Sequence, residues 1–370
     1  MIECNKKTED DKMSDKLFQR IKELTELQGI SGYERNVRQY LVEHMTPLVD
    51  EIEVSDLGNV YGIIRSKQQN APKVMIAAHM DEVGFMVTEI HNNGTMSVTP
   101  IGGWNVYAVS AQRYTLQTAK GDYPIVSSAV APHLLRGGGQ AASLKPEDIR
   151  FDAGFDSKEE AESYGVRPGN AIVPEVETIY AANGKNLIGK SWDNRYGCVA
   201  ILDLLEYVQG KELDCDLIIG ANVQEEVGLR GVRGAVTRYQ PDVFIAVDCS
   251  PAGDSESSTG VQGRLGEGFL LRMQDPGMLT HRGLIDYFVE TAERHEIDYQ
   301  YFFSKGGTDA GAAHTMNEGI ISGVIGVPAR YIHGHQSIYR LSDYQAAIAM
   351  LQQVVTEFNV ETLKTIRENN

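Results

Sequence analysis

The chain has 370 residues, 42% of them hydrophobic, which is enough for one large domain or two ordinary ones with a sizeable core. It carries 51 acidic and 34 basic side chains, and the formal net charge of −17 argues against nucleic acid and anionic membranes as partners. The four cysteines lack the paired spacing of a zinc-thiolate or disulfide framework, so a reducing cytoplasm is the expected location.

The N-terminal part predicts alternating helices and strands. Residues 1–13 are polar and lack the apolar core of a secretory signal. Apolar residues at helical spacing predict a helix over 14–28, and the pair Ser31 and Glu34 predicts a capping box that begins a second helix. Strands are expected over 52–54, 59–65 and 74–78. The last of these is a continuous apolar run, typical of a buried strand, and His79 follows it.

From Val83 to about Tyr180 the pattern changes to short alternating runs broken by Gly, Pro and Asn, which predicts a small β-rich module. Within it, residues 137–139 are three glycines and are expected to form a mobile loop. After Gly184 the α/β alternation returns, with helices expected over 194–207, 279–295 and 343–368 and strands over 217–223, 243–247, 299–303 and 324–325. The predicted fold class is α/β, a mixed-sheet sandwich of residues 1–86 and 184–370 interrupted by a β-rich domain over 87–183.

Polar clusters follow several of the predicted strands. Asp81 lies two residues after His79, and an aspartate there can orient the imidazole and fix its tautomer, as beside a metal ligand. The alternative is a structural histidine with a helix-capping aspartate. Glu225 and Glu226 follow another apolar run, and on a continuing strand they would point to opposite faces, one as a metal ligand and one as a base. The alternative is a pair of solvated glutamates at a turn.

Three further positions complete the pattern. Asp193 precedes an apolar helix, where it would either bridge two ions or cap that helix. Asp248 follows a strand-like run, and α/β sheets commonly bind ligands at such strand ends. The alternative is an ordinary turn at the end of the strand. His333 and His335 follow another strand-like run and are either ligands or surface residues. Carboxylates and imidazoles suit divalent first-row metals, and a water shared by two ions becomes a nucleophile near neutral pH. The pattern as a whole therefore predicts a two-metal hydrolase.

Six segments of the sequence resemble the dinuclear metallo-aminopeptidases that form tetrahedral dodecamers. They are residues 78–85, 191–197, 222–231, 247–254, 305–311 and 329–333. The likeness extends from Leu17 to the C-terminal helix, and the bacterial glutamyl members of that family are the most similar. One departure is Gly334, where family members commonly carry serine, and the glycine is expected to loosen the loop that follows His333.

The resemblance implies a role for each of these residues. The implied metal ligands are His79, Asp193, Glu226, Asp248 and His333. Asp193 would bridge two divalent ions, zinc or cobalt, with His79 and Asp248 on one ion and Glu226 and His333 on the other. Glu225 would be the general base that activates water, and Asp81 would orient His79. Basic residues of the first substrate pocket in the glutamyl members match Arg272 and Lys305.

The function implied is a metal-dependent aminopeptidase that releases N-terminal Glu or Asp from short peptides. The inserted domain 87–183 is expected to mediate dimerisation, and the dimers to assemble into a homo-dodecamer. The alternatives are a general or aliphatic-preferring aminopeptidase and a dinuclear deacylase. A glycosidase is disfavoured, because it needs carboxylates among aromatic platforms and the chain has only two tryptophans. An inactive scaffold is also disfavoured, since the five ligand positions and Glu225 are intact.

Overall fold

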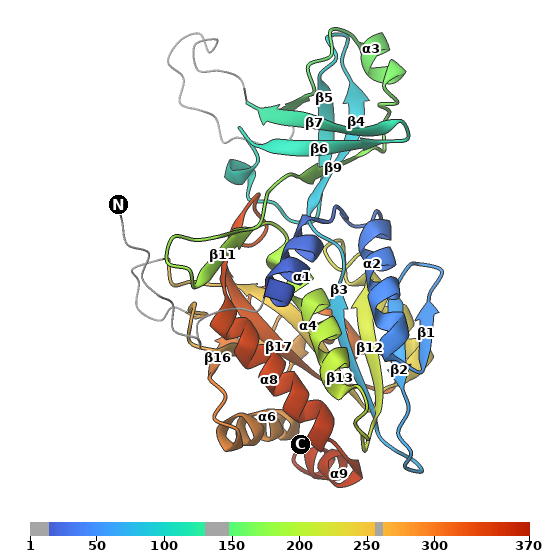
Figure 1. Ribbon diagram of the computed structural model, residues 1–370, viewed down its shortest axis with the longest axis vertical. Helices are drawn as coiled ribbons and strands as arrows, with labels where there is room; N and C mark the ends of the chain where they lie inside the picture. The colour runs from blue at the N-terminus through green and yellow to red at the C-terminus, as the bar shows by residue number, and fades with distance from the viewer. Residues whose placement is uncertain (1–14, 130–147, 256–261) are drawn as a thin grey trace.

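The computed structural model describes residues 15–129, 148–255 and 262–370. The polar segment 1–13 and the glycine loop 137–139 lie outside these residues. The described chain forms a large α/β part and a smaller β-barrel that projects from one end of it (Figure 1). This arrangement confirms the α/β class with a mixed sheet and a β-rich insertion.

The large sheet is mixed, with parallel strands at its centre. In spatial order its main strands are β1 (Glu51–Val54), β2 (Val60–Ile64), β12 (Asp216–Asn222), β3 (Lys73–His79), β13 (Val243–Pro251), β17 (Ile321–Arg330), β18 (Ser337–Arg340), β11 (Asn186–Gly189) and β10 (Ile179–Tyr180). A branch beside β17 contains β14 (Phe269–Asp275), β15 (Met278–Leu279) and β16 (Tyr299–Phe303). The strands β12, β3, β13 and β17 run parallel, so their carboxyl ends meet at one edge of the sheet.

Helices cover both faces of the large sheet. On one face lie α1 (Asp15–Glu26), α2 (Arg35–Met45), α4 (Trp192–Val208), α6 (Arg282–Arg294), α8 (Leu341–Glu357) and α9 (Val360–Glu368), and on the other α5 (Arg230–Tyr239) and α7 (Asp309–His314). Strand β3 explains why two layers are needed. Val74 and Ile76 pack into one hydrophobic core, whereas the alternate residues Met75 and Ala77 pack into the other.

The barrel is closed by six strands and has a core of its own. Its strands, in spatial order, are β4 (Gly84–Ile90), β5 (Met96–Ile101), β8 (Arg150–Asp152), β7 (Gly121–Ser128), β6 (Arg113–Thr118) and β9 (Ala171–Pro174), and the short helix α3 is Lys158–Ser163. Phe85, Tyr114 and Phe151 pack their rings together with centroids 5.1–5.7 Å apart. Because β4 follows β3 after a short turn, the base of the barrel lies next to the strand end that carries His79.

Two local predictions are wrong. The expected capping box is absent, because α2 begins only at Arg35 and the Ser31 hydroxyl donates its hydrogen bond to Asp81 instead. The single closing helix is two helices, α8 and α9. Phe358 adopts an extended conformation that ends α8, and the Asn359 side chain caps α9 by accepting the amide hydrogen of Thr362 at 3.0 Å.

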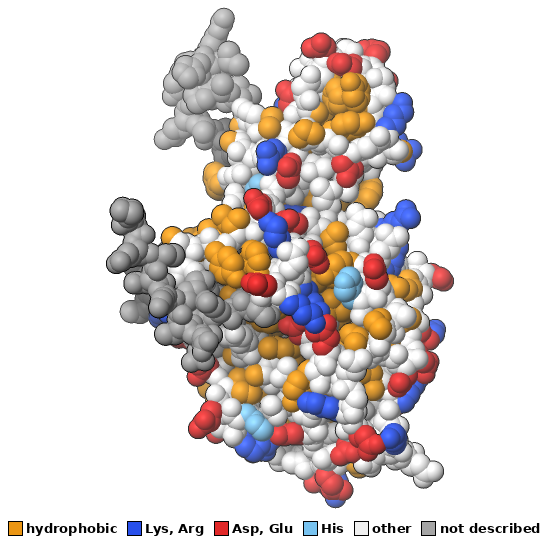
Figure 2. Space-filling view, in the orientation of Figure 1, with side chains coloured by type: hydrophobic (Ala, Val, Ile, Leu, Met, Phe, Trp, Pro, Cys, Tyr) orange, Lys and Arg blue, Asp and Glu red, His pale blue; other side chains and the backbone are white. Residues whose placement is uncertain are grey.

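The surface bears charge of both signs. Figure 2 shows acidic and basic side chains interspersed over the visible face of both parts of the molecule. Within the ranges that the structure describes, no helix combines the length and the apolar character that crossing a bilayer requires.

Candidate metal centre

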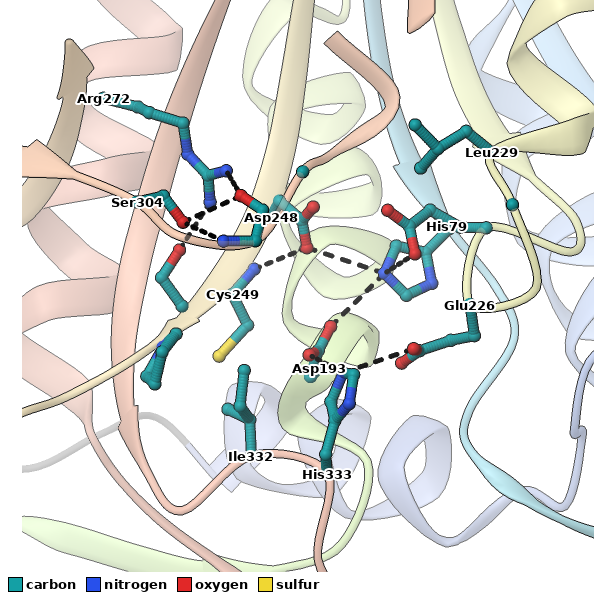
Figure 3. A pocket seen from close by; sticks show the side chains of 16 residues that line it. His79, Asp193, Glu226, Leu229, Asp248, Cys249, Arg272, Ser304, Ile332 and His333 are labelled. Atoms are coloured by element: carbon teal, nitrogen blue, oxygen red, sulfur yellow. Dashed lines mark hydrogen bonds and ion pairs between the residues drawn. The ribbon is translucent and has the colours of Figure 1, made fainter. Parts of the chain in front are cut away.

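The candidate residues gather at the carboxyl edge of the parallel strands, where α/β sheets commonly bind ligands. His79 is the last residue of β3 and Asp248 lies in β13, while Asp193 belongs to the first turn of α4. Glu226 lies in the turn after β12, and His333 in the loop between β17 and β18. All five side chains line one pocket between the strand ends (Figure 3).

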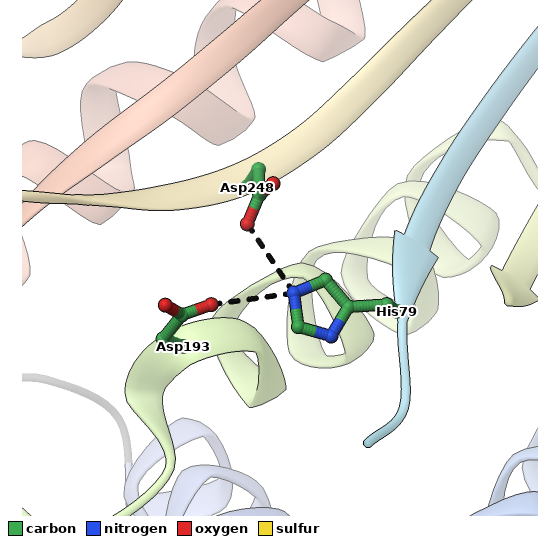
Figure 4. A group of neighbouring side chains, drawn as sticks. All are labelled: His79, Asp193 and Asp248. Atoms are coloured by element: carbon green, nitrogen blue, oxygen red, sulfur yellow. Dashed lines mark ion pairs between the residues drawn. The ribbon is translucent and has the colours of Figure 1, made fainter. Parts of the chain in front are cut away.

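His79 is the centre of a first group of donors. Its Nε2 atom lies 3.3 Å from Oδ1 of Asp193 and 3.5 Å from Oδ1 of Asp248 (Figure 4). The other ring nitrogen, Nδ1, lies 3.2 Å from the backbone oxygen of Asp81 and 3.5 Å from its Oδ1. A proton on Nδ1 is therefore held by Asp81, which leaves the Nε2 lone pair directed at the two aspartates.

His333 is the centre of a second group, which shares Asp193 with the first. Nε2 of His333 lies 3.2 Å from Oε2 of Glu226 and 3.5 Å from Oδ2 of Asp193. The two oxygens of Asp193 thus face different histidines. The backbone of Asp193 is not helical, with φ −83° and ψ 104°, so this residue does not continue the helix regularly. In each group the potential ligand atoms lie within 4.8 Å of one another.

The two adjacent glutamates are directed by a turn and not by a strand, which corrects the expected geometry. Strand β12 ends at Asn222, and the amide hydrogens of Gly228 and Leu229 bond to the carbonyl oxygen of Glu225. Asp81 holds the turn in place, because its two carboxylate oxygens accept the amide hydrogens of Glu225 and Glu226, each at 3.1 Å. The side-chain oxygen Oε2 of Glu225 then lies 3.9 Å from Nε2 of His79, inside the pocket.

The electrostatics of the pocket show an excess of negative charge. Burial and the Asp193 carboxylate raise the pKa of Glu226 to about 8, and burial raises the pKa of Glu225 well above its usual value. Burial disfavours a charged His333, yet Asp193 and Glu226 outweigh it and raise the pKa of that imidazole to about 9. The pocket places four carboxylates, those of Asp193, Glu225, Glu226 and Asp248, around the imidazoles of His79 and His333. Divalent cations would offset the negative charge of such a cluster.

The donor set fits two divalent metal ions. Each group provides carboxylate oxygens and one imidazole nitrogen, the mixture that suits zinc, cobalt and related first-row ions. Asp193 supplies one oxygen to each group, as a bridging ligand requires. Because Asp81 already orients His79, the site also has the outer hydrogen bond that metal-binding histidines typically make.

The two basic residues predicted for the substrate pocket differ in their surroundings. Arg272 is buried and lines the pocket, but its guanidinium is already engaged by Asp275 at 3.1 Å, Ser250 at 2.8 Å and the carbonyl oxygen of Gly306 at 3.0 Å. Its Nε atom is buried and has no hydrogen-bond partner within the described ranges. Lys305 is exposed, and although its neighbours Ser304 and Gly306 line the pocket, Lys305 does not.

Sequence reasoning missed several residues that support the site. Ser31 donates to Oδ2 of Asp81 at 2.6 Å, and Glu34 accepts the amide hydrogen of Gln224 at 3.1 Å beside the turn that carries Glu225 and Glu226. The spacing of Ser31 and Glu34 fits a helix cap, so the sequence did not predict these hydrogen bonds. Asp275, the partner of Arg272, lies three residues after it in strand β14. Residues at that spacing point to opposite faces of a regular strand, so the pairing could not be predicted from the sequence.

Comparisons with known proteins agree with this geometry. Residues 58–350 match the profile of the family described as M42 glutamyl aminopeptidase. The glutamyl aminopeptidase of Lactococcus lactis subsp. cremoris is 49% identical over 353 residues, covering 95% of this chain and 99% of that protein. A solved TET aminopeptidase from Thaumarchaeota archaeon SCGC AB-539-E09 has a TM-score of 0.91 at 32% identity, covering 95% and 100% of the two chains. PhTET1-12s, solved as a dodecamer, has a TM-score of 0.83 at 27% identity, covering 94% and 100%.

Proposed function

Since the chain belongs to the M42 glutamyl aminopeptidase family, we propose that it is a metal-dependent aminopeptidase that releases N-terminal Glu or Asp from short peptides. The observation that carries this proposal is the shared position of Asp193. Its carboxylate belongs to both donor groups of the pocket, and Glu225 lies beside the first of them. A pocket with two adjacent ion sites and a nearby carboxylate is suited to hydrolysis of a peptide bond.

Two divalent ions, Zn²⁺ or Co²⁺, would be held by the five ligands of the two groups. His79 and Asp248 would hold one ion, Glu226 and His333 the other, and Asp193 both. When bound, such ions polarise a carbonyl group and lower the pKa of water. Asp81 would act through His79, keeping the imidazole nitrogen Nε2 directed into the site.

Glu225 is proposed as the general base. Its side chain is only 10% exposed, and Oε2 faces the pocket beside His79. From this position Oε2 can accept a proton from the attacking water and deliver it to the nitrogen of the departing amine. Burial and the neighbouring carboxylates raise the pKa of Glu225, so the group is a stronger base than a solvated glutamate once it is ionised.

The preference for acidic residues is proposed from the two basic side chains and from the likeness to a glutamyl aminopeptidase at 49% identity. Arg272 lines the pocket, but its charge is paired with Asp275, so it would attract an acidic substrate side chain less than a free guanidinium would. Lys305 would contribute its charge from beside the pocket residues Ser304 and Gly306, where screening by solvent limits its effect.

We further propose that residues 1–86 and 184–370 form the catalytic domain and that residues 87–183 mediate dimerisation within a homo-dodecamer. The solved dodecamer of a similar peptidase supports this assembly. A cytoplasmic location is proposed because the three cysteines in the described ranges, Cys198, Cys215 and Cys249, are free and buried, as is usual in a reducing compartment.

The test is hydrolysis of the p-nitroanilides of Glu, Asp, Leu and Lys, before and after chelation and after Zn²⁺ or Co²⁺ is restored. We expect chelation to abolish cleavage and added metal to restore it, chiefly for Glu and Asp. Restored cleavage that favours Leu would support the general or aliphatic-preferring alternative. Cleavage that survives chelation would contradict the metal-dependent mechanism, and no cleavage under any metal would favour a dinuclear deacylase.

A further inference from the structure

The loop that carries His333 is held in an unfavourable backbone conformation. His333 has φ +52°, in the left-handed region that residues other than glycine rarely adopt. Such a conformation is unfavourable for a residue with a side chain and persists only where the surroundings enforce it. The next residue, Gly334, adds no side chain to stiffen the loop. The restraint on His333 must therefore come from outside residues 331–334.

The base of the barrel supplies that restraint. Just after strand β5, the amide hydrogen of Asn105 bonds to the carbonyl oxygen of His333 at 3.2 Å. The backbone of Gly103 lies so close to the imidazole that a Cβ added there would be 3.1 Å from Nδ1 of His333. The same segment contacts Gly334, whose own added Cβ would lie 3.8 Å from Cβ of Ala108. The barrel thus contacts the loop on both the backbone and the ring of His333.

His335 makes the second attachment, two residues further along the loop. Its ring is 5% exposed, and Nε2 donates to the backbone oxygen of Arg113 in strand β6 at 2.6 Å. The ring also meets Tyr114 of the barrel core edge-on, with centroids 5.0 Å apart. Its Nδ1 atom is buried without a partner among the residues that the structure describes, a cost that an apolar side chain would avoid. The directional contact that His335 makes in return is the hydrogen bond to the barrel.

We propose that His335 is a positioning residue that locks the His333 loop onto the barrel, so that the barrel completes the second ion site of its own subunit. The inference rests on the proposed function, because it assumes that His333 is a metal ligand. It gives the barrel a role in the chemistry that is separate from assembly. Loss of the His335 attachment frees the loop, lets His333 relax from its left-handed conformation, and weakens the ion site of Glu226 and His333 but not that of His79 and Asp248.

The experiment compares His335→Phe with His335→Gln on the full-length protein. Phenylalanine retains the ring contact with Tyr114 but cannot donate to Arg113, whereas glutamine retains a donor. Metal-free protein is titrated with Co²⁺ by absorption spectroscopy and with Zn²⁺ by calorimetry. We expect His335→Phe to weaken one of two binding steps by about 10–100-fold, the range typical for loss of a residue that orients a metal ligand. His335→Gln should recover most of that loss, and His333→Ala should abolish the same step.

A second pair of variants tests the inference without altering His335. Gly103→Ala places a methyl group against the His333 ring and should weaken the same binding step, while Gly234→Ala, in helix α5 with nothing within 4 Å of the added Cβ, should not. Thermal midpoint and oligomer size are measured in parallel. The positioning role would be overturned if both metal-binding steps were unchanged in His335→Phe and Gly103→Ala. It would also be overturned if both steps were weakened equally and His335→Gln recovered neither. Fewer than two ions on the unmodified chain would overturn the proposed function itself, and this inference with it.

Discussion

The carboxylate of Asp81 is hydrogen-bonded to the backbone of Glu225, whose amide hydrogen its Oδ1 atom accepts at 3.1 Å. Oδ2 accepts the next amide along the turn, that of Glu226, and the hydroxyl hydrogen of Ser31. One buried side chain thus orients His79 and fixes the turn that carries both glutamates. Burial alone would raise the pKa of Asp81, but His79 and the hydrogen bonds to Ser31 and Glu225 hold it below its usual value.

Replacing Asp81 with asparagine should therefore damage more than the orientation of His79. An asparagine has one acceptor oxygen and an NH₂ group in place of the second oxygen. That NH₂ group would face an amide or hydroxyl hydrogen that the carboxylate accepted, so two donors would point at each other. We expect Asp81→Asn to lower kcat/KM by about 10–100-fold and the free energy of unfolding by about 1–3 kcal/mol. Ser31→Ala removes a single bond to the same carboxylate and serves as the milder control. An Asp81→Asn variant with kcat/KM and thermal midpoint equal to those of the unmodified chain would refute this role.

Glu225→Gln tests the base directly. Glutamine has nearly the same shape but cannot accept a proton, so kcat should fall by at least about 100-fold. Because Glu225 belongs to neither donor group, metal content measured by elemental analysis should remain that of the unmodified chain. Glu226→Gln is the matched control, since it alters the neighbouring position within a donor group and should lower metal content. Near-normal turnover in Glu225→Gln would remove this residue from the role of base.

Much of this site could be predicted from the sequence, because its residues lie at strand ends and strand ends are readable from apolar runs. His79 illustrates this, as it ends an apolar run and is the last residue of β3. Asp248 also follows an apolar run, but β13 continues past it to Pro251, and the parallel pairing of β3 and β13 brings the two residues together. The direction of Glu225 and Glu226 could not be predicted, because it depends on Asp81, which is distant in sequence. Ser31 and Glu34 were misread for the same reason. Their local spacing fits a helix cap, but tertiary hydrogen bonds to Asp81 and Gln224 determine their use.

Gly334→Ser should strengthen the His333 loop. Gly334 does not have a positive φ, and an added Cβ would approach no atom closer than 3.8 Å, so serine fits without strain. Replacing glycine at a compatible position typically stabilises a protein by about 0.4–1 kcal/mol, because it restricts the unfolded chain. We expect a small rise in thermal midpoint and slightly tighter binding of the second ion, measured by Co²⁺ titration. A fall in both quantities would show that the loop needs the freedom of glycine.

Lys305 and Arg272 should respond differently to removal of their charge. Lys305→Leu changes an exposed side chain, so stability should hold while kcat/KM falls more for Glu-p-nitroanilide than for Leu-p-nitroanilide. Arg272→Met instead leaves Asp275 buried without its partner, which typically costs about 3–5 kcal/mol of stability. The thermal midpoint should therefore fall sharply, whatever the effect on substrate preference. An equal loss on both substrates in Lys305→Leu would exclude that lysine from selecting acidic residues.

The buried carboxyl group of Asp343 should make the stability of the protein depend on pH, independently of the metal site. Its side chain is buried in helix α8, and burial raises its pKa to about 6, although it accepts the amide hydrogens of Gly266 and Gly268. A raised pKa means that the folded protein favours the protonated acid. The stability that this group contributes is therefore fully present below about pH 4, its range in the unfolded chain, and is lost as pH rises through about 6.

The Asp343→Asn variant cannot ionise and so lacks this loss. At about 1.4 kcal/mol per pH unit, the unmodified chain should lose of the order of 2–3 kcal/mol relative to the variant between pH 4 and 7.5. The comparison uses metal-free protein, so that ligand protonation does not differ between the two chains. We expect the thermal midpoint of Asp343→Asn, relative to that of the unmodified chain, to rise between about pH 4 and pH 6 and then to level off. A difference that stays constant with pH would mean that Asp343 remains ionised in the fold, held by its two backbone donors against the cost of burial.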